Sequence, residues 1–342
     1  MTAARPLRDA TVATLGLLAA IHAGSGGLTR LDPALLGYLA ATVAAGFATV
    51  YRMSAFWRRP ASAFYVRTLL GTVRHPRRLG QMLRGAARDL AAQRFIARRS
   101  RARWLAHLLL SGGTLASFAI TLPLVWGWLH FEAEEQRTYR AFFLSIPVTR
   151  FAVDGAVGWL VFHALSLAAV TVVFGSAYFL VVRLRARRQP GTTGGFHLSP
   201  LLLLLVVALT GLALPVAGRS GSPGLFQAAA TVHEVSVIVL LLALPFSKLA
   251  HLLIRPLQLG VQVVRAPGVP RVSCAGCGAA LAPAAQRDAV EGLLEARGFR
   301  LAGYQRRCPA CRRRQVAAAQ AELLGAQFQP RPAGTRASGE TA

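Results

Sequence analysis

Residues 233–251, HEVSVIVLLLALPFSKLAH, place one histidine at each end of a long apolar stretch. His233 and His251 are 18 residues apart (251 − 233), which is five turns of an α-helix, so a continuous helix would present both rings on one face. At a rise of about 1.5 Å per residue, the rings would lie roughly 27 Å apart. The hydrocarbon core of a bilayer is about 30 Å thick. The spacing predicts one imidazole near each membrane surface, either as interfacial histidines without a partner or as one axial ligand for each of two haems.

The composition of the whole chain favours a membrane protein. Of its 342 residues, 54% are hydrophobic and 15% are charged, which is too apolar for an ordinary soluble domain. Six apolar segments approach the ~20 residues that a spanning helix needs. They cover residues 10–28, 33–53, 104–129, 157–182, 198–217 and 232–254.

Arginine placement predicts how these segments cross the membrane. The formal net charge is +26, and most arginines flank apolar segments, so we expect a membrane surface and no nucleic acid as the partner. Residues 52–103 contain fourteen arginines and one acid, Asp89, whereas 130–156 is richer in acids. The positive-inside rule then places 52–103, 183–197 and 255–342 in the cytoplasm. The sequence predicts a multi-pass protein of the bacterial inner membrane, surrounded by lipid, with a cytoplasmic C-terminal domain.

Depth along the predicted helices suggests which histidines form pairs. His107 lies one turn inside the third segment and His251 one turn before Arg255, so both are expected near the cytoplasmic surface. His233 would stand roughly 33 Å above that surface, and His163, on the fourth segment, roughly 30 Å. Ionisable side chains within a membrane are costly and are functional by default. We therefore predict an inner haem between His107 and His251. The outer pair would be His233 with His163, unless His163 only bonds a neighbouring helix.

Three stretches resemble the respiratory nitrate reductase gamma subunit family, which includes the cytochrome b subunits of heterodisulfide reductase and of the sulfite-reductase-associated membrane complex. HEVSVIVLLLALPFSKLAH resembles the last helix of that family, with two histidines at this spacing and a PFSKLxH-like ending. RARWLAHLLLSGGTLASFAITLPL resembles its second conserved helix. LLLLLVVALTGLALPVAGR, with its Thr-Gly pair, resembles the helix before the last. The likeness covers about residues 75 to 260.

The resemblance implies a haem b subunit that relays electrons between menaquinone or ubiquinone and a cytoplasmic iron–sulfur or oxidoreductase subunit. His107, His233 and His251 match the ligand positions of the family. Ser117 departs from it, because the nitrate reductase subunit has a second histidine there, ten residues after the first. Either His163 substitutes and two haems bind, or the outer haem is absent. No catalytic residue is predicted, because two axial imidazoles leave iron without an open position.

Charged residues beside the predicted ligands have two interpretations each. Glu234 could exchange protons with a quinone, or it could be a carboxylate favoured by a helix N-terminus. Lys248 and Arg255 could pair with haem propionates, or they could extend to the membrane interface.

The four cysteines form a separate motif, CxxC-x30-CxxC, at Cys274, Cys277, Cys308 and Cys311. Two such knuckles, separated by strands and a short helix at about 284–297, can present four thiolates tetrahedrally. The pattern predicts a zinc-ribbon-like site, with rubredoxin-like iron as the alternative. Arginines at 312–314 disfavour iron, because small and acidic residues usually follow rubredoxin knuckles.

Together these patterns predict an all-α membrane protein, a bundle of about six transmembrane helices with a small C-terminal cytoplasmic zinc-ribbon-like domain. The expected divisions are N-terminal transmembrane helices at 1–56, a basic interfacial segment at 57–103, a cytochrome b-like bundle at 104–256, a metal-binding domain at 257–328 and a disordered tail at 329–342. The expected function is quinone-linked electron transfer within an oxidoreductase complex. The alternative is a haem-free membrane anchor or transporter with a zinc-ribbon interaction module.

Overall fold

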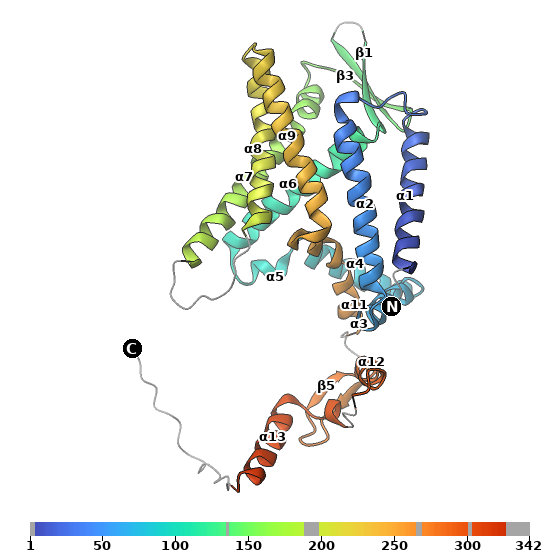
Figure 1. Ribbon diagram of the computed structural model, residues 1–342, viewed down its shortest axis with the longest axis vertical. Helices are drawn as coiled ribbons and strands as arrows, with labels where there is room; N and C mark the ends of the chain where they lie inside the picture. The colour runs from blue at the N-terminus through green and yellow to red at the C-terminus, as the bar shows by residue number, and fades with distance from the viewer. Residues whose placement is uncertain (1–3, 135–136, 188–197, 265–268, 300–302, 326–342) are drawn as a thin grey trace. The chain divides into compact units, whose positions relative to one another are not determined.

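The chain forms two compact units in this computed structural model (Figure 1). The structure describes all residues except 1–3, 135–136, 188–197, 265–268, 300–302 and 326–342. The predicted tail at 329–342 therefore lies outside the described residues, as does most of 183–197. We call Met1–Arg59 with Thr72–Leu259 the helical unit, and Pro60–Gly71 with Gly260–Ala342 the cysteine unit.

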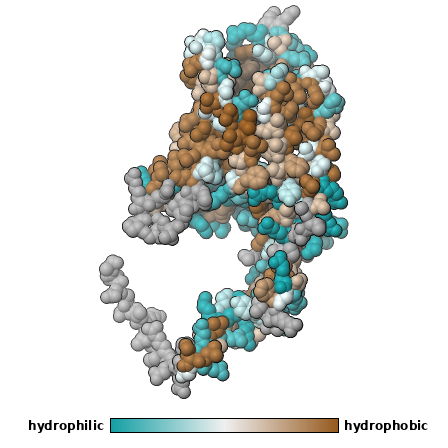
Figure 2. Space-filling view, in the orientation of Figure 1, coloured by the Kyte–Doolittle hydropathy of each residue, from teal (hydrophilic) through white to brown (hydrophobic). Residues whose placement is uncertain are grey.

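Five helices of the helical unit are long and apolar enough to cross a membrane, which indicates a multi-pass membrane protein. They are built on α2 (Leu36–Trp57), α6 (Arg101–Val125), α7 (Ala156–Arg187), α8 (Ser199–Arg219) and α9 (Pro223–Ala243). Large apolar side chains on these helices, such as Phe174 and Val216, are exposed. Figure 2 shows hydrophobic residues gathered over this unit, as expected for helices that contact lipid.

The first predicted segment corresponds to α1 (Ala4–Gly24), which is helical but does not belong to these five spans. Arg8 and Asp9 in its second turn shorten its apolar stretch. A sixth span stays a prediction.

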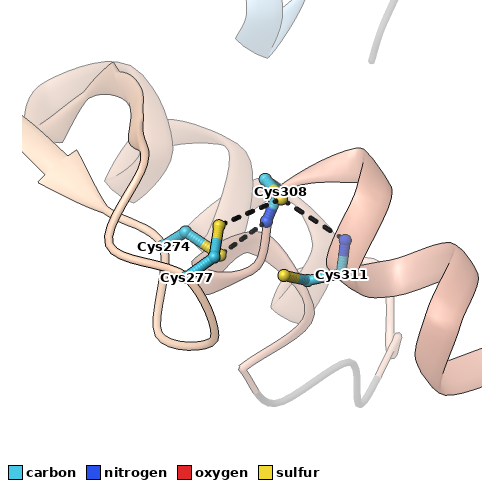
Figure 3. Close-up of side chains that lie close together, drawn as sticks. All are labelled: Cys274, Cys277, Cys308 and Cys311. Atoms are coloured by element: carbon cyan, nitrogen blue, oxygen red, sulfur yellow. Dashed lines mark hydrogen bonds between the residues drawn. The ribbon is translucent and has the colours of Figure 1, made fainter. Parts of the chain in front are cut away.

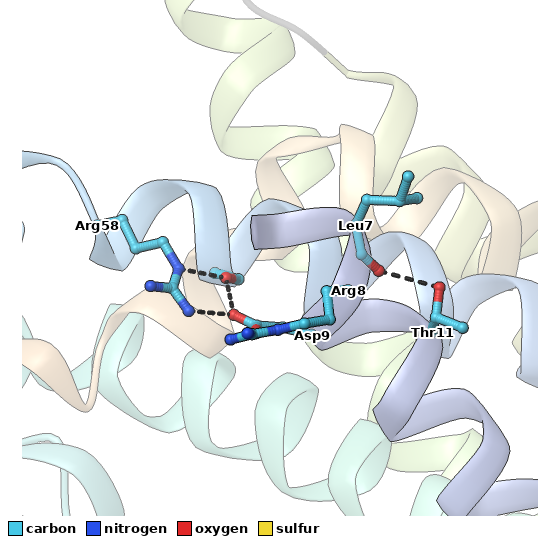
Figure 4. A network of polar contacts seen from close by, with 6 residues as sticks. Leu7, Arg8, Asp9, Thr11 and Arg58 are labelled. Atoms are coloured by element: carbon cyan, nitrogen blue, oxygen red, sulfur yellow. Dashed lines mark hydrogen bonds and ion pairs between the residues drawn. The ribbon is translucent and has the colours of Figure 1, made fainter. Parts of the chain in front are cut away.

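Contacts at both ends fasten α1 to the rest of the helical unit. Near its start, the Asp9 carboxylate accepts a hydrogen bond from the Ser54 hydroxyl at 2.6 Å and pairs with the Arg58 guanidinium, both from the end of α2 (Figure 4). Near its other end, the Trp128 indole N–H donates to the Ala20 carbonyl at 3.1 Å. The Asp9 contacts at one end and the hydrogen bond from the Trp128 indole at the other therefore fix the position of α1.

Neighbouring helices pack in the order α1, α2, α9, α8, α7, α6. Two small apolar clusters are buried between them, Val172, Leu204, Ala208 and Leu240 in one and Ala41, Ala45 and Leu241 in the other. Helices α6 and α7 come especially close. A Cβ on Gly113 would lie 2.7 Å from the Ala168 carbonyl oxygen, and one on Gly175 would lie 2.6 Å from the Ala106 carbonyl oxygen. Glycine at these positions lets the two backbones approach.

The connection between α6 and α7 is a three-stranded antiparallel sheet, so the prediction of an all-α fold is wrong here. The strands β1 (Leu129–Glu134), β2 (Thr138–Phe143) and β3 (Ile146–Ala152) pair in chain order. Phe131, Tyr139 and Phe151 each pack a ring against Phe162 of α7. Each strand thus contributes one aromatic ring to the contact with α7.

The predicted span at 232–254 is not one continuous helix. Helix α9 ends at Ala243, and three short helical turns follow, Leu244–Phe246, Lys248–Ala250 and α10 (His251–Ile254). Between the first two turns, Ser247 is extended, with φ −96° and ψ 178°. Pro245 has no backbone N–H and its ring obstructs a preceding helical turn. The expectation that the two terminal histidines share one face of a single helix is therefore wrong.

The basic segment before α6 consists of short helices, α3 (Pro60–Val73), α4 (Pro76–Ala86), a π-helical turn (Ala87–Ala91) and α5 (Arg94–Ala97). As predicted, none of them is a candidate membrane span. The Trp104 indole N–H donates to the Ala92 carbonyl at 2.8 Å, and the Arg255 guanidinium lies 5.1 Å from the centre of the Phe95 ring. The first contact holds the α5 region against the start of α6, and the second joins it to the end of α10.

The described residues of the cysteine unit include most of α3, the second half of α11 (Leu257–Val264), a two-stranded hairpin and two further helices. After α11, its elements are β4 (Arg271–Ser273), β5 (Ala280–Pro283), α12 (Ala284–Glu295) and α13 (Pro309–Leu323). Helix α12 agrees with the helix predicted at 284–297. The first cysteine knuckle is the turn between β4 and β5, and the second starts α13.

Candidate functional sites

His233 on α9 is held by a hydroxyl from α8. The Thr210 Oγ1 lies 3.0 Å from His233 Nδ1 and donates its own proton to the Val206 carbonyl at 2.9 Å. When Nδ1 carries the ring proton, this hydroxyl accepts its hydrogen bond and Nε2 keeps the lone pair. A Cβ on Gly211 would lie 3.1 Å from the Cε1 atom of the ring, so the Thr-Gly pair both binds and makes room for the imidazole.

A cavity of about 360 Å³ opens beside His233, with walls from α2, α6, α7, α8 and α9. Most of its lining is apolar, and His233 is the only histidine among the described residues that line it. Ser117 lines the same cavity. The hydroxyls of Thr114, Ser117 and Thr121 each donate to a carbonyl of their own helix, at 2.7 to 2.9 Å. The cavity therefore combines one imidazole with walls that offer a ligand few hydrogen-bond donors.

His163 on α7 does not belong to the described lining of this cavity. Its Nδ1 lies 2.8 Å from the Trp159 carbonyl oxygen, one turn earlier on the same helix. Its ring stacks on the Trp159 indole, with centroids 4.8 Å apart. The structure thus places His163 outside the cavity that His233 lines.

His107 and His251 lie in one neighbourhood of the helical unit. His107 Nδ1 is 2.7 Å from Gln93 Oε1, and His251 Nδ1 is 2.5 Å from the Lys248 carbonyl oxygen. His251 and Arg255 both interact electrostatically with His107. The two histidines of the predicted inner pair are thus within electrostatic range of each other, although His251 lies beyond the end of α9.

Glu234 follows His233 on α9 and points toward α2. A Cβ on Gly37 would collide with its Oε1 atom, and Tyr38, which lines the cavity, interacts with it electrostatically. Helix α9 begins at Pro223, eleven residues earlier (234 − 223). The interpretation of Glu234 as a carboxylate at a helix N-terminus is therefore wrong.

The four cysteines of the cysteine unit converge on one point (Figure 3). Their sulfur atoms all lie within 4.8 Å of one another, and Cys277 Sγ is 3.7 Å from Cys308 Sγ. Backbone contacts join the two knuckles, since Ala275 N–H donates to the Arg306 carbonyl at 2.8 Å. This cluster could hold a metal ion such as zinc or iron.

Backbone N–H groups favour the thiolate form of two of these cysteines. Those of Cys308 and Gly276 donate to Cys274 Sγ at 3.1 and 3.4 Å, and they lower the pKa of the Cys274 thiol to about 6. The N–H of Cys311 likewise lowers the pKa of Cys308. Neighbouring thiols, first that of Cys308, raise the pKa of Cys311 to about 12. Metal binding would release the protons that remain.

Three features of these sites were not predicted. Gln93 contacts His107 across 14 positions of the chain and stands among arginines, so no spacing or motif indicates it. The cavity depends on which faces of five helices meet, and the helices are apolar on every side. The Thr-Gly pair on α8 was part of a family-like motif, but its contact with His233 was not foreseen.

No protein-family model matches the chain, and no curated protein or solved structure matches it either. The fold and the sites define its class, a multi-pass helical membrane protein with a four-cysteine cluster that could bind a metal ion.

Proposed function

We propose that the protein is a haem b-binding membrane subunit that relays electrons between the quinone pool and a cytoplasmic iron–sulfur or oxidoreductase subunit. The observation that carries this proposal is the proximity of His107 and His251, each with Nδ1 at an oxygen atom. Metal-bound histidines almost always donate their second ring N–H to such an acceptor. The resemblance to the nitrate reductase gamma subunit family supports the same function.

The donor chemistry of these residues fits a haem. His107 and His251 would each offer Nε2, and the positive charges of Lys248 and Arg255 would pair with the propionates. A haem with two axial imidazoles supplies one-electron transfer and leaves no position for a substrate. The protein holds one ring from α6 and the other from the turns that follow α9.

We propose one haem per chain, because the cavity beside His233 suits a quinone better than a second haem. The cavity offers one imidazole among its described lining, and its volume is near the lower end of the range for small-molecule sites, about 300–1,000 Å³. Its mostly apolar walls suit the ring of menaquinone or ubiquinone better than a macrocycle with two charged propionates. The Nε2 lone pair of His233 would accept a hydrogen bond from a quinol hydroxyl, and the Glu234 carboxylate, beside Tyr38, would be an acceptor for the proton.

Zinc in a ribbon-like site is the proposed occupant of the cysteine cluster. The distance of 3.7 Å between Cys277 Sγ and Cys308 Sγ is close to the edge of about 3.8 Å that a tetrahedron with Zn–S bonds of about 2.3 Å requires. Rubredoxin-like iron has similar geometry and is the alternative.

The proposed location is the bacterial inner membrane, with the cysteine cluster in the cytoplasm. The support is charge, because the segments at 52–103 and after 255 are strongly basic and the sheet between α6 and α7 is not. A cytoplasmic cluster would be in place to contact the proposed partner subunit.

The haem content of purified variants tests this function. His107→Ala and His251→Ala should each lose the haem, because each removes one axial ligand. His75→Ala, at an exposed position, and His163→Ala should keep it. His233→Ala should keep the haem and weaken quinol binding, measured by titration with a soluble quinol analogue.

The same measurements identify the competing outcomes. If His163→Ala lowers the haem content by half, two haems bind and His163 serves the outer one. If the wild-type protein contains no haem, the proposal fails, and a membrane anchor or transporter with a metal-binding module becomes the better account.

A further inference from the structure

Gln93 occupies a strained and buried position beside the predicted inner haem site. Its exposed fraction is 6%, although Arg94 and Phe95 next to it are exposed. Its backbone is left-handed, with φ 49° and ψ 38°, a region that residues other than glycine rarely adopt. Such strain persists where surrounding contacts enforce it. The Trp104 indole, bonded to the Ala92 carbonyl at 2.8 Å, holds this turn against α6.

The side chain of Gln93 bridges two residues one turn apart on α6. Its Nε2 atom donates to Ser111 Oγ at 2.9 Å, and its Oε1 atom lies 2.7 Å from His107 Nδ1. Ser111 Oγ in turn donates to the His107 carbonyl at 2.7 Å. Three hydrogen bonds thus join Gln93, Ser111 and His107 in one network.

The network permits one assignment of protons. A serine hydroxyl has a single proton, and that of Ser111 is used by the His107 carbonyl, so Ser111 Oγ must accept from the Gln93 amide. The amide oxygen therefore faces His107, and an oxygen of this kind can only accept. If the Gln93 amide were flipped, its oxygen would face Ser111 and would need the Ser111 proton. The hydrogen bond from Ser111 to the His107 carbonyl would then be lost. His107 Nδ1 must consequently carry the proton.

We propose that Gln93 is the positioning residue for His107: it fixes the imidazole as the Nδ1-protonated tautomer and so reserves the Nε2 lone pair for iron. This inference rests on the proposed function for its purpose, but the hydrogen-bond network stands without it. The left-handed backbone brings the amide into a buried contact that the exposed arginine-rich segment would otherwise not make. Gln93 itself does not touch the iron or the quinone.

Nitrogen NMR of histidine-labelled protein tests the tautomer without haem. The measurement uses the full chain with His251→Ala, which keeps His107 and is expected to hold no haem, and a His107→Ala spectrum assigns the signal. His107 should be protonated at Nδ1. Gln93→Leu should shift protonation to Nε2, the form that imidazole prefers in water, and Gln93→Glu should preserve Nδ1–H because a carboxylate also accepts.

Gln93→Gly separates the side chain from the strained backbone. Glycine adopts the left-handed conformation without penalty, so this variant should fold even if Gln93→Leu does not. It should still lose the Nδ1-protonated form. An Nδ1–H signal that survives in Gln93→Gly or Gln93→Leu would overturn the proposal, as would Nε2–H in the parent protein.

The haem-loaded protein provides a second readout, the midpoint potential. Gln93→Glu should retain haem and shift the potential downward, because a carboxylate makes the ligand imidazole more electron-rich. Gln93→Leu should weaken haem binding by about 10–100-fold, as losses of such supporting contacts usually do. Equal potentials in wild type and Gln93→Glu would contradict the assignment, and the tautomer spectra separate positioning from a simple effect of the added charge. A wild-type protein without haem would instead reject the proposed function and leave the tautomer result intact.

Discussion

Each histidine predicted as a ligand has an oxygen atom at Nδ1. The partners are the side chains of Gln93 and Thr210 and the backbone carbonyls of Trp159 and Lys248. A polar group away from water is costly unless it is hydrogen bonded, so these partners explain how imidazoles can occupy apolar helices. With Nδ1 occupied in this way, Nε2 is the ring atom that a metal would bind. His163 has such a contact as well, although it is not among the described residues that line the cavity.

The Asp9 carboxylate should make stability depend on pH. Hydrogen bonds from Ser54 and then Arg58 lower the pKa of Asp9 to about 2, whereas it is about 3.9 in an unfolded chain. Because the folded-state pKa is the lower one, the stabilisation is complete above about pH 4 and is lost as the pH falls toward 2. Asp9→Asn should therefore lower the melting temperature in detergent at pH 7, and the difference from wild type should vanish near pH 2.

Asp154→Asn is the matched control, because its pair with Arg137 is exposed on both sides and such pairs contribute little. A melting-temperature difference for Asp9→Asn that stays constant from pH 7 to pH 2 would show that the α1–α2 contact does not depend on this charge.

At the scale of single residues, sequence patterns indicate candidate ligand histidines more readily than the residues that contact them. Histidines in apolar segments are conspicuous, and counting residues from basic flanks placed His107 and His251 at one depth. Such counting does not indicate Gln93 as the partner of His107, because its contact with α6 requires a left-handed turn. The pairing of His233 with His163 used depth alone, and depth does not determine which face of a helix a side chain occupies.

At the scale of elements, close packing of α6 on α7 is the contact most sensitive to substitution. Gly113 and Gly112 are neighbours on α6, but a Cβ meets α7 only at Gly113 and finds open space at Gly112. Gly113→Ala should destabilise the protein by about 1–3 kcal/mol, the usual cost of overpacking. Gly112→Ala should stabilise it by about 0.5–1 kcal/mol through helix propensity. Thermal unfolding in detergent compares the two, and equal effects would contradict the close α6–α7 approach.

Five of the predicted spans are present as helices because long apolar segments have few alternatives in a membrane. Two places in the chain depart from this rule. In the 129–152 connection, three strands each place one aromatic ring on Phe162. At residues 245–248, PFSK, the proline ends α9 within a mostly apolar segment. A prediction from hydrophobicity alone therefore made this helix too long.

At the scale of the whole molecule, the two compact units should respond differently to loss of metal. Cys277→Ser removes one of four sulfur ligands, so the purified protein should lose the zinc of the cysteine cluster, measured by elemental analysis. Residues 271–323 should then become sensitive to protease, while the melting of the helical unit stays unchanged. Ser273→Ala, beside the first knuckle, should retain the zinc. Full zinc content in Cys277→Ser would rule out a four-cysteine site, whereas a wild type without zinc and with iron in excess of its haem would make iron the occupant of the cluster.

The central claim is that His107 and His251 bind one haem b at one side of a membrane bundle. The most direct measurement is the reduced-minus-oxidised absorption spectrum of the purified full-length protein, combined with its haem-to-protein ratio. We predict the α-band of a six-coordinate b-type haem at about one haem per chain, absent in His251→Ala and present in His75→Ala. A wild-type spectrum without that band, from protein supplied with haem during expression, would contradict the account.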